Sequence, residues 1–405
     1  MATPREWEYL KIPGKFIREQ DGEYDLRITE ELWEGAYIDE VKLYAVDHPA
    51  EIEVETNEKV GPPSVAEHRL FTARERRLPT AARDARGNDL LPHLTKGDDV
   101  YTATFHNKVR QGMAEEHYLE LDFGKLPKFE QLHLYLTGWL YPTDTSINVA
   151  VTHDPRLSPP KPPSIQVPDA GGSWKEVVPF CGFPGGKTKT VVYDLSGVFL
   201  TEDYRIRLVS NMEFYWDSVF FTLDEPGEKL EMKELPLKGA SLHYRGFSAR
   251  VEHPANGPER YDYGTASEAA KWPALEGKLT RYGEVTDLIR AGDDRLVVMA
   301  GGDELRIRFG VPAESPPPGW KRDFVLYNVG WDKDADLNTV AGSGVEPLPY
   351  RKMDTYPPIS PDGSPEWDDA EGESYRNYLS TYQTRTQSPR RFWSHVLSSN
   401  HDQRP

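Results

Sequence analysis

Oxygen-bearing side chains alternate along one acidic segment of this chain. They are Asp332, Asp334, Asp336 and Asn338. Ca²⁺ prefers oxygen ligands, and a short loop can turn alternate side chains toward one ion. The segment is not an EF-hand, because Leu337 stands where that loop needs glycine and Ser343 where it needs glutamate. Two interpretations remain: a looser Ca²⁺-binding loop, or an acidic turn whose carboxylates accept hydrogen bonds from the local backbone.

The sequence carries no established catalytic motif. The run Gly182–Thr188 is close to a phosphate-binding loop, but Cys181 stands where that motif needs glycine and a strand-like run follows it. We therefore interpret it as a loop between two strands. No His-x-x-x-His, Cys-x-x-Cys or Gly-x-Ser-x-Gly spacing occurs. Neighbouring carboxylates such as Asp39 and Glu40 are frequent, but a glycan hydrolase needs two of them about 5 to 9 Å apart in space.

Aromatic side chains are the stronger candidates for recognition. We expect Trp139, Tyr141 and Trp174 to bind a ligand, since an exposed ring can stack on a sugar or on a partner's side chain. Trp139 and Tyr141 stand at the end of a predicted strand near Pro142, where we expect exposure. Trp216 alternates with apolar residues, which predicts burial. For each ring the alternative is packing in the core.

Short runs of β-branched and aromatic residues, separated by turn residues, must position these side chains. Six strands are expected between residues 116 and 223, one of them at 146–151, which predicts a sandwich or jelly roll. Helical signals are local: one short turn at 285–290 and a terminal helix within 375–397. The expected fold class is mostly β, with two or three antiparallel sandwich domains and long irregular loops.

The length of 405 residues suits two or three domains at ~150 residues each. We expect an N-terminal β domain at 1–115 with a long loop excursion, a central sandwich at 116–226, and a β-rich domain with a proline-rich tail at 227–405. A cluster of basic residues falls in the excursion. It consists of Arg74, Arg76, Arg77, Arg83 and Arg86. We interpret it as a surface paired with acidic neighbours; the alternative is an anion or partner site.

The net charge of −18 argues against nucleic acid as a partner, because an acidic field repels phosphate. The single cysteine, Cys181, cannot form an internal disulfide. No apolar run is long enough for a membrane helix. The sequence begins without an apolar signal core, which fits either a cytoplasmic protein or a chain cut from a longer precursor.

Several stretches resemble the C-terminal region of bacterial FG-GAP/ASPIC-UnbV proteins, which are similar to cartilage acidic protein. The matching stretches lie in residues 7–58, at 182–190 and at 330–339. The resemblance implies an exported protein, extracellular or periplasmic, that binds or adheres. The chain departs from the full pattern because it has no propeller repeat, no FG-GAP calcium loop and no export signal, which leaves the cytoplasm open as well. No residue role is carried over.

The favoured function is non-catalytic recognition of a carbohydrate or of a protein partner, through loops and aromatic residues of a β-sandwich. One alternative is a glycan-active hydrolase that uses two carboxylates. Another is a structural subunit of a cell-surface assembly. Ca²⁺ is the only cofactor that the sequence suggests, and an oligomer is left open.

Overall fold

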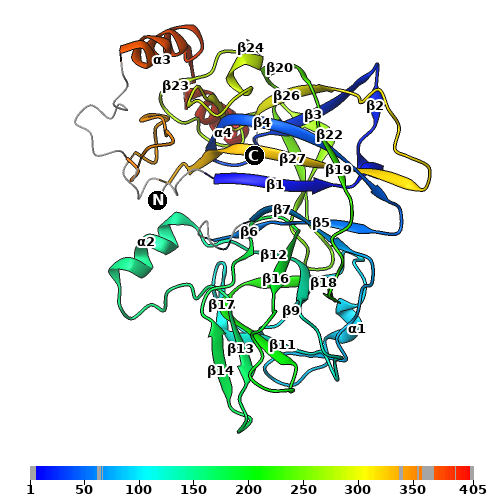
Figure 1. Cartoon of the computed structure of the whole chain (residues 1–405). Helices are drawn as coiled ribbons and strands as arrows, with labels where there is room; N and C mark the ends of the chain where they lie inside the picture. The colour runs from blue at the N-terminus through cyan, green and yellow to red at the C-terminus, as the bar shows by residue number, and fades with distance from the viewer. Residues whose placement is uncertain are drawn as a thin grey trace. The chain divides into compact units, whose positions relative to one another are not determined.

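The computed structural model describes residues 6–61, 65, 67–336, 341–353, 355–357, 369–387 and 389–401. The expected mostly-β fold is confirmed, because antiparallel sheets carry the structure (Figure 1). The chain divides into two compact units. The first unit comprises Met1–Asp47, Glu231–Arg250 and Tyr261–Pro405, and the second comprises His48–Leu230 and Val251–Arg260.

Two antiparallel sheets form the first unit. One contains β1 (Glu6–Ile12), β27 (Trp320–Asp334), β4 (Glu34–Pro49), β19 (Glu231–Glu234) and β25 (Val297–Ala300). The other contains β2 (Glu19–Gln20), β3 (Glu23–Thr29), β26 (Asp303–Gly310), β20 (Leu237–Tyr244) and β24 (Gly283–Glu284). The core of the unit joins Leu43 and Val297 of the first sheet to Leu305 and Ile307 of the second, and all four are fully buried. Side chains alternate between the two faces of a strand, so each sheet buries one face against the other, as in the predicted sandwich.

Smaller elements complete the first unit. They are the pair β21 (Phe247–Val251) and β22 (Arg260–Ser267), the pair β23 (Lys278–Leu279) and β28 (Arg385–Thr386), the short 3-10 helices η1 (Gly14–Phe16) and η2 (Thr286–Leu288), and the helices α3 (Asp369–Thr381) and α4 (Arg390–His401). The turn expected at 285–290 is confirmed by η2. The tail expected to hold one helix within 375–397 holds parts of two.

The second unit is also built on two antiparallel sheets. One contains β10 (Lys108–Arg110), β11 (Met113–Asp122), β17 (Arg205–Met212), β13 (Ser164–Pro168), β14 (Trp174–Val178) and β8 (Ala81–Arg83). The other contains β16 (Lys189–Asp194), β12 (Leu132–Leu140), β18 (Phe214–Leu223) and β9 (Thr102–Ala103). Leu121 and Ile206 of the first sheet share one core with Leu134 and Leu136 of the second, and all four are fully buried.

The remaining elements are the pair β5 (Glu53–Asn57) and β7 (Glu67–Ala73), the pair β6 (Lys59–Val60) and β15 (Phe183–Pro184), and the helices α1 (Leu91–Leu94) and α2 (Thr145–His153).

The compact units do not follow the expected segments 1–115, 116–226 and 227–405. Strand β1 pairs with β27 from Glu6 opposite Gly330 to Ile12 opposite Phe324, so an early and a late segment of the chain share one sheet. An alternating pattern shows that a segment is a strand, but it does not show which distant strand will pair with it. The division into contiguous domains therefore differs from the division in the structure.

Residues 146–151, expected to form a strand, belong to helix α2 instead. Asp144 caps this helix, because its Oδ1 accepts the backbone N–H of Ile147 at 2.7 Å. The alternation of Ile147, Val149 and Val151 imitates a strand, yet none of the helix residues is buried. Figure 1 shows α2 projecting from the sheets of the second unit. An N-cap signal therefore outweighs a short alternating pattern here.

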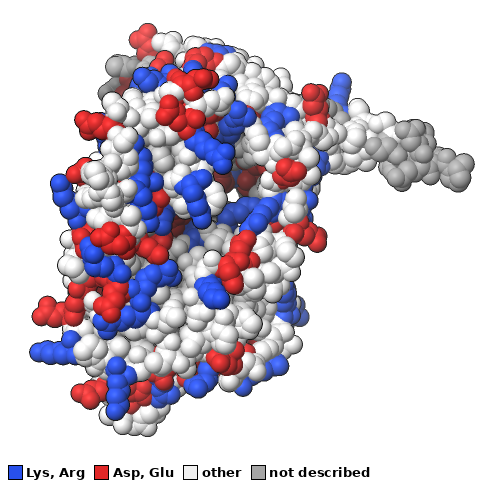
Figure 2. Space-filling model, turned by 90° about the vertical axis from the view of Figure 1, so that its right-hand side faces the viewer, with Lys and Arg blue, Asp and Glu red and all other residues white. Residues whose placement is uncertain are grey.

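The expected pairing of the arginine cluster with acidic neighbours is confirmed for four of its members, including Arg86, which lies 3.9 Å from Glu115. Arg74 lies 2.8 Å from Glu228, while Arg76 and Arg77 lie 2.9 and 3.0 Å from Glu53 and Glu75. Figure 2 shows that acidic and basic side chains are interspersed over the face that it presents. Exposed pairs of this kind contribute little stability, roughly 0–1 kcal/mol each.

Gly138 marks a point where two backbones of the second unit approach closely. The register between β12 and β18 shifts between Thr137 and Gly138, as in a β-bulge. A Cβ atom at Gly138 would lie 2.4 Å from the carbonyl oxygen of Tyr215 and 2.5 Å from the ring of Trp216. Both neighbours lie in the sandwich, so neither can move without disturbing the core.

We expect Gly138→Ala to lower the free energy of unfolding by about 1–3 kcal/mol, because the added methyl group overpacks the bulge. Urea denaturation followed by circular dichroism measures the loss. Gly227→Ala is the matched control, since a Cβ atom there meets nothing within 4 Å. Equal midpoints for the two variants would contradict the tight packing at Gly138.

Candidate functional site

Trp139 is buried, so its expected exposure is wrong. Only 8% of the residue is exposed. Its ring stacks on Tyr215 with the centroids 5.1 Å apart, and its Nε1 donates to the carbonyl oxygen of Asn256 at 2.9 Å. Asn256 belongs to the segment 251–260, which comes late in the sequence but is part of the second unit. The local sequence pattern around Trp139 does not show that the distant residue Asn256 packs against it. Trp216 is buried, as expected.

The other two expected ligand-binding rings differ from each other. Tyr141 is 39% exposed, as expected for a residue after the end of β12. Trp174 is half-buried, and the guanidinium of Arg207 lies 4.0 Å from its ring centroid. That cation–π contact covers one face of the indole ring. Tyr141 therefore keeps an open surface, whereas Trp174 already has a partner within the protein.

The acidic segment expected to bind Ca²⁺ is partly strand. Asp332 and Asp334 lie in β27, Asp336 follows the strand, and Asn338 lies outside the described residues. A strand spaces alternate residues about 6.6 Å apart, whereas a Ca²⁺ loop wraps its oxygens around the ion at about 2.4 Å. Within the part of the chain that the structure describes, no three His, Cys, Asp or Glu side chains are grouped to hold a metal.

A pocket of about 390 Å³ in the first unit gathers aromatic side chains from separate segments. The rings that line it belong to Trp33, Tyr244, Phe247, Trp272, Tyr282 and Phe392. Trp33, Trp272 and Tyr282 are 37%, 38% and 39% exposed, which places half-open rings around one concave surface. Such clustering differs from the isolated exposed aromatic residue that most protein surfaces carry.

Hydrogen bonds fix the orientation of these rings. Trp272 Nε1 donates to the carbonyl oxygen of Glu31 at 3.0 Å, and the Tyr244 hydroxyl donates to that of Glu268 at 2.9 Å. The Tyr282 hydroxyl donates to Oδ1 of Asp303, also at 2.9 Å. Burial, followed by the Asp303 charge, raises the pKa of Tyr282, so the phenol stays protonated. Because these polar atoms have partners inside the protein, the rings offer a ligand mainly their faces and edges.

Two charged residues, Glu34 and Arg385, are among the lining residues that the structure describes. Arg385 is engaged on all sides: Nη2 lies 2.6 Å from Asp303 Oδ2, Nε donates to Thr280 O at 2.8 Å, and Nη1 donates to the Tyr282 hydroxyl at 2.9 Å. Burial raises the pKa of Asp303, and the Arg385 charge opposes that rise. The guanidinium is therefore a fixed part of the wall whose charge Asp303 offsets.

Glu30 and Glu34 form a hydrogen-bonded pair of carboxyl groups at the same wall. Glu30 is buried, and its Oε1 accepts the backbone N–H of Leu32 at 3.0 Å. Burial raises the pKa of Glu30 well above its ordinary value, and the charges of Glu34 and Asp332 raise it further. The pair therefore holds a proton at pH values where an exposed glutamate has lost it.

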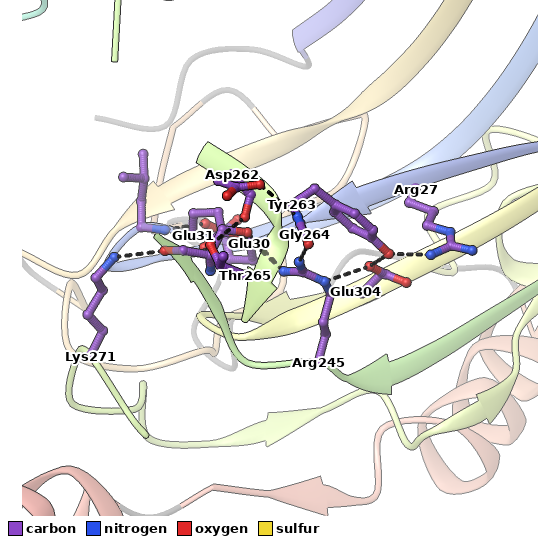
Figure 3. A network of polar contacts seen from close by, with 12 residues as sticks. Arg27, Glu30, Glu31, Arg245, Asp262, Tyr263, Gly264, Thr265, Lys271 and Glu304 are labelled. Carbon is purple, nitrogen blue, oxygen red and sulfur yellow. Dashed lines mark hydrogen bonds and ion pairs between the residues drawn. The ribbon is translucent and has the colours of Figure 1, made fainter. Parts of the chain in front are cut away.

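A buried ionic network joins several segments of the first unit (Figure 3). Arg245, which follows β20, lies between two buried carboxylates: its Nη1 is 3.6 Å from Glu31 Oε1, and its Nε is 3.4 Å from Glu304 Oε2. The Tyr263 hydroxyl from β22 donates to Glu304 Oε2 at 2.7 Å. Ser248 in β21 donates its N–H and its hydroxyl to Glu31 at 2.8 and 2.6 Å. The network thus ties the β21–β22 pair to β26. The backbone carbonyl oxygen of Glu31 also accepts the hydrogen bond from the Trp272 indole N–H.

Comparison of the chain with protein-family models, with curated proteins and with solved structures gave no match. The resemblance to the C-terminal region of FG-GAP/ASPIC-UnbV proteins therefore stays a prediction, as does the exported location that it implies. Among the described segments, no helix has both the length and the apolar character needed to cross a membrane.

Sequence reasoning missed the pocket because its residues are far apart in the chain. Trp33 lies in the bend between β3 and β4, Trp272 between β22 and β23, and Tyr282 between β23 and β24. Trp272 stands directly before Pro273, the same kind of loop signal that drew attention to Tyr141 before Pro142. That signal could have identified each ring as a loop residue. It could not have shown that the rings converge on one pocket.

We expect Arg245→Met to destabilise the protein by about 3–5 kcal/mol, because it leaves Glu31 and Glu304 buried without their cation. Denaturant titration measures this loss. Arg308→Met is the matched control, since Arg308 pairs with Glu23 at 3.2 Å but the two side chains are 42% and 29% exposed, far more than those of the Arg245 network. A loss at Arg245 no larger than at Arg308 would show that the network is not a structural anchor.

We expect Glu30→Gln to stabilise the protein at pH 7.5 but not at pH 4. The folded state keeps a proton on Glu30 that the unfolded chain releases above the ordinary pKa of 4.5. Wild-type stability therefore falls as pH rises from that value to the raised folded pKa, by up to about 1.4 kcal/mol per pH unit. Because glutamine cannot ionise, the stability of the variant does not fall with pH in this way.

Thermal melts of wild type and Glu30→Gln across pH 4 to 8 test the effect. Glu19→Gln, at an exposed position in β2, reports the cost of the substitution itself. A gap between wild type and Glu30→Gln that does not widen with pH would contradict a retained proton.

Proposed function

We propose that this protein is a non-catalytic binding protein that takes a carbohydrate into the aromatic pocket of the first unit. The observation that carries the proposal is the convergence of three half-exposed rings, Trp33, Trp272 and Tyr282, on one pocket of about 390 Å³. This volume falls at the lower end of the range of small-molecule pockets, about 300–1,000 Å³, which favours a short ligand.

The chemistry of the lining suits a sugar. The C–H faces of a pyranose ring are apolar and pack on aromatic faces, while its hydroxyl groups need a few well-placed polar partners. Glu34, Thr386 and Gln387 supply such partners beside the rings. The proposal keeps the expected class of function but assigns it to a site in the first unit, instead of to the predicted residues Trp139, Tyr141 and Trp174 of the second.

A hydrolase is the second candidate, because a carboxyl pair with one proton lies at the pocket wall. Glycosidases use one protonated and one ionised carboxyl group, and the raised pKa of Glu30 would suit the protonated member. However, glycosidase pairs stand about 5 Å or more apart to leave room for the scissile bond, whereas these two groups are hydrogen-bonded to each other. Binding is therefore the better supported function.

We expect Trp272→Ala and Tyr282→Ala each to weaken carbohydrate binding roughly tenfold or more, since each removes an aromatic surface whose burial contributes about 1.5 kcal/mol. A glycan array identifies a ligand, and isothermal titration calorimetry then measures its affinity. Tyr141→Ala is the matched control, because Tyr141 is equally exposed but lies in the second unit.

Three outcomes would count against this proposal. The first is an array on which wild type binds no carbohydrate, and the second is a loss of affinity in Tyr141→Ala as large as that in Trp272→Ala. The third is release of new reducing ends from a bound oligosaccharide, abolished in Glu34→Gln, which would establish the hydrolase instead.

A further inference from the structure

We propose that Asn256 is a site of spontaneous deamidation, and that the packing of the segment 251–260 keeps this site unreactive in the folded protein. The inference goes beyond the proposed function and does not depend on it, because the segment belongs to the second unit and the aromatic pocket to the first. It is carried by the residue that follows Asn256 in the chain and by the contacts that hold both reacting groups.

The reaction joins the side chain of Asn256 to the backbone that follows it. The nitrogen of Gly257 attacks Cγ of Asn256, and the new bond closes a cyclic imide. The Cγ–Nδ2 bond breaks, so Nδ2 leaves as ammonia together with the hydrogen of the Gly257 nitrogen. Water then opens the imide to aspartate or to isoaspartate. Asparagine is among the thermolabile residues, and Asn256 is the one asparagine of the chain that glycine follows, with no Cβ to hinder the attacking nitrogen.

The backbone at Asn256 points the attacking nitrogen away from the side chain. Its φ of 56° lies in the left-handed region, which asparagine tolerates and where ψ is about +47°. At that ψ the Gly257 nitrogen and the Asn256 Cβ lie on opposite sides of the bond between Cα and the carbonyl carbon. The nitrogen therefore has to turn by roughly half a rotation about this bond before it can reach Cγ.

Hydrogen bonds hold the nitrogen in that position. The backbone N–H groups of Gly257 and Ala255 both donate to Nδ1 of His253, each at 3.1 Å. Because two donors converge on Nδ1, the ring proton is assigned to Nε2, which lies 3.2 Å from Oδ2 of Asp99. A Cβ atom at Gly257 would lie 2.6 Å from the imidazole, so the turn is packed against the ring. Rotation of the Gly257 nitrogen toward Cγ of Asn256 therefore breaks a hydrogen bond and lifts the turn off His253.

The side chain and the carbonyl group of Asn256 are held as well. Its Nδ2 donates to the carbonyl oxygen of Tyr101 at 3.4 Å, and its own carbonyl oxygen accepts the indole N–H of Trp139 at 2.9 Å. The backbone N–H of Tyr101 donates to the carbonyl oxygen of Ala255 at 3.0 Å. The segment must release these contacts before the imide can form, whereas the exposed position of Asn256 leaves it open to the water that completes the reaction.

Deamidation would undo the contacts that prevent it. An aspartate product places a carboxylate oxygen where Nδ2 donated, and two acceptors then face each other at Tyr101. An isoaspartate product routes the main chain through Cγ and so displaces the carbonyl group that accepts the Trp139 N–H. Either product weakens the docking of the segment, which makes the modification a one-way release of the contact to Trp139.

The segment can be followed as a single peptide in the full chain. Trypsin cuts after Arg250 and Arg260, and the peptide 251–260 that it releases contains one amide side chain, that of Asn256. Deamidation raises the mass of this peptide by about one unit. We expect folded wild type at pH 7.5 to deamidate roughly tenfold or more slowly than a synthetic peptide of the same sequence, since the reaction requires local opening. In concentrated urea the two rates should converge.

Variants of the second unit test the contacts. His253→Ala removes the acceptor for the Gly257 N–H, and we expect it to deamidate several-fold faster than wild type while it remains folded by circular dichroism. His153→Ala is the matched control, because His153 is exposed at the end of α2 in the same unit. Asn256→Asp imitates one product, and hydrogen exchange of the segment 251–260 should be faster in it than in wild type.

The outcomes separate the protection from the release. Folded wild type that deamidates as fast as the free peptide would overturn the protection. A folded His253→Ala that reacts no faster than wild type would overturn the role assigned to His253, and a slower reaction would show that the imidazole instead takes the proton of the Gly257 nitrogen. If His253→Ala does not fold, Trp139→Phe replaces it, since phenylalanine keeps a ring but cannot donate to Asn256; an unchanged rate there would overturn the protective contact. Equal hydrogen exchange in wild type and Asn256→Asp would overturn the release.

Discussion

The pairing of the early strand β1 with the late strand β27 is the constraint on which the first unit depends. Strand β27 lies between β1 and β4, so the sheet is incomplete until the segment 320–334 has been made. Closing so long a loop costs entropy that only the finished sheet repays, which makes folding of this unit slow relative to one built from local contacts. The second sandwich, by contrast, needs no residue beyond Arg260.

The aromatic pocket depends on the same late assembly. Its rings come from the bend before β4, from β20 and β21, from the loops around β23 and from α4, which are far apart in the sequence. Hydrogen bonds from Trp272, Tyr244 and Tyr282 to other segments then fix the orientation of three of the rings. A preorganised aromatic wall loses less conformational entropy when a ligand binds, which favours affinity.

Most of the strands could be predicted from the sequence, but few features of the candidate site could. Alternating runs such as Leu305 to Phe309 predicted strands correctly, since burial on one face has a period of two. The run at 146–151 misled because an N-cap at Asp144 decides that segment locally. Trp139 misled because its cover, Asn256, is 117 positions away in the sequence. Strand partners, buried ion pairs and converging loops are all properties of long-range contacts, which a local pattern does not encode.

The discontinuous division of the chain has a practical consequence for dissecting it. The backbone passes between the two units at four places, after residues 47, 230, 250 and 260. A single cut, whether by a protease or by truncation of the gene, therefore cannot yield either sandwich as an intact piece. A minimal fragment of the second must stop no earlier than residue 260, and the first can be isolated only by excising internal residues and joining the flanking strands with a new turn.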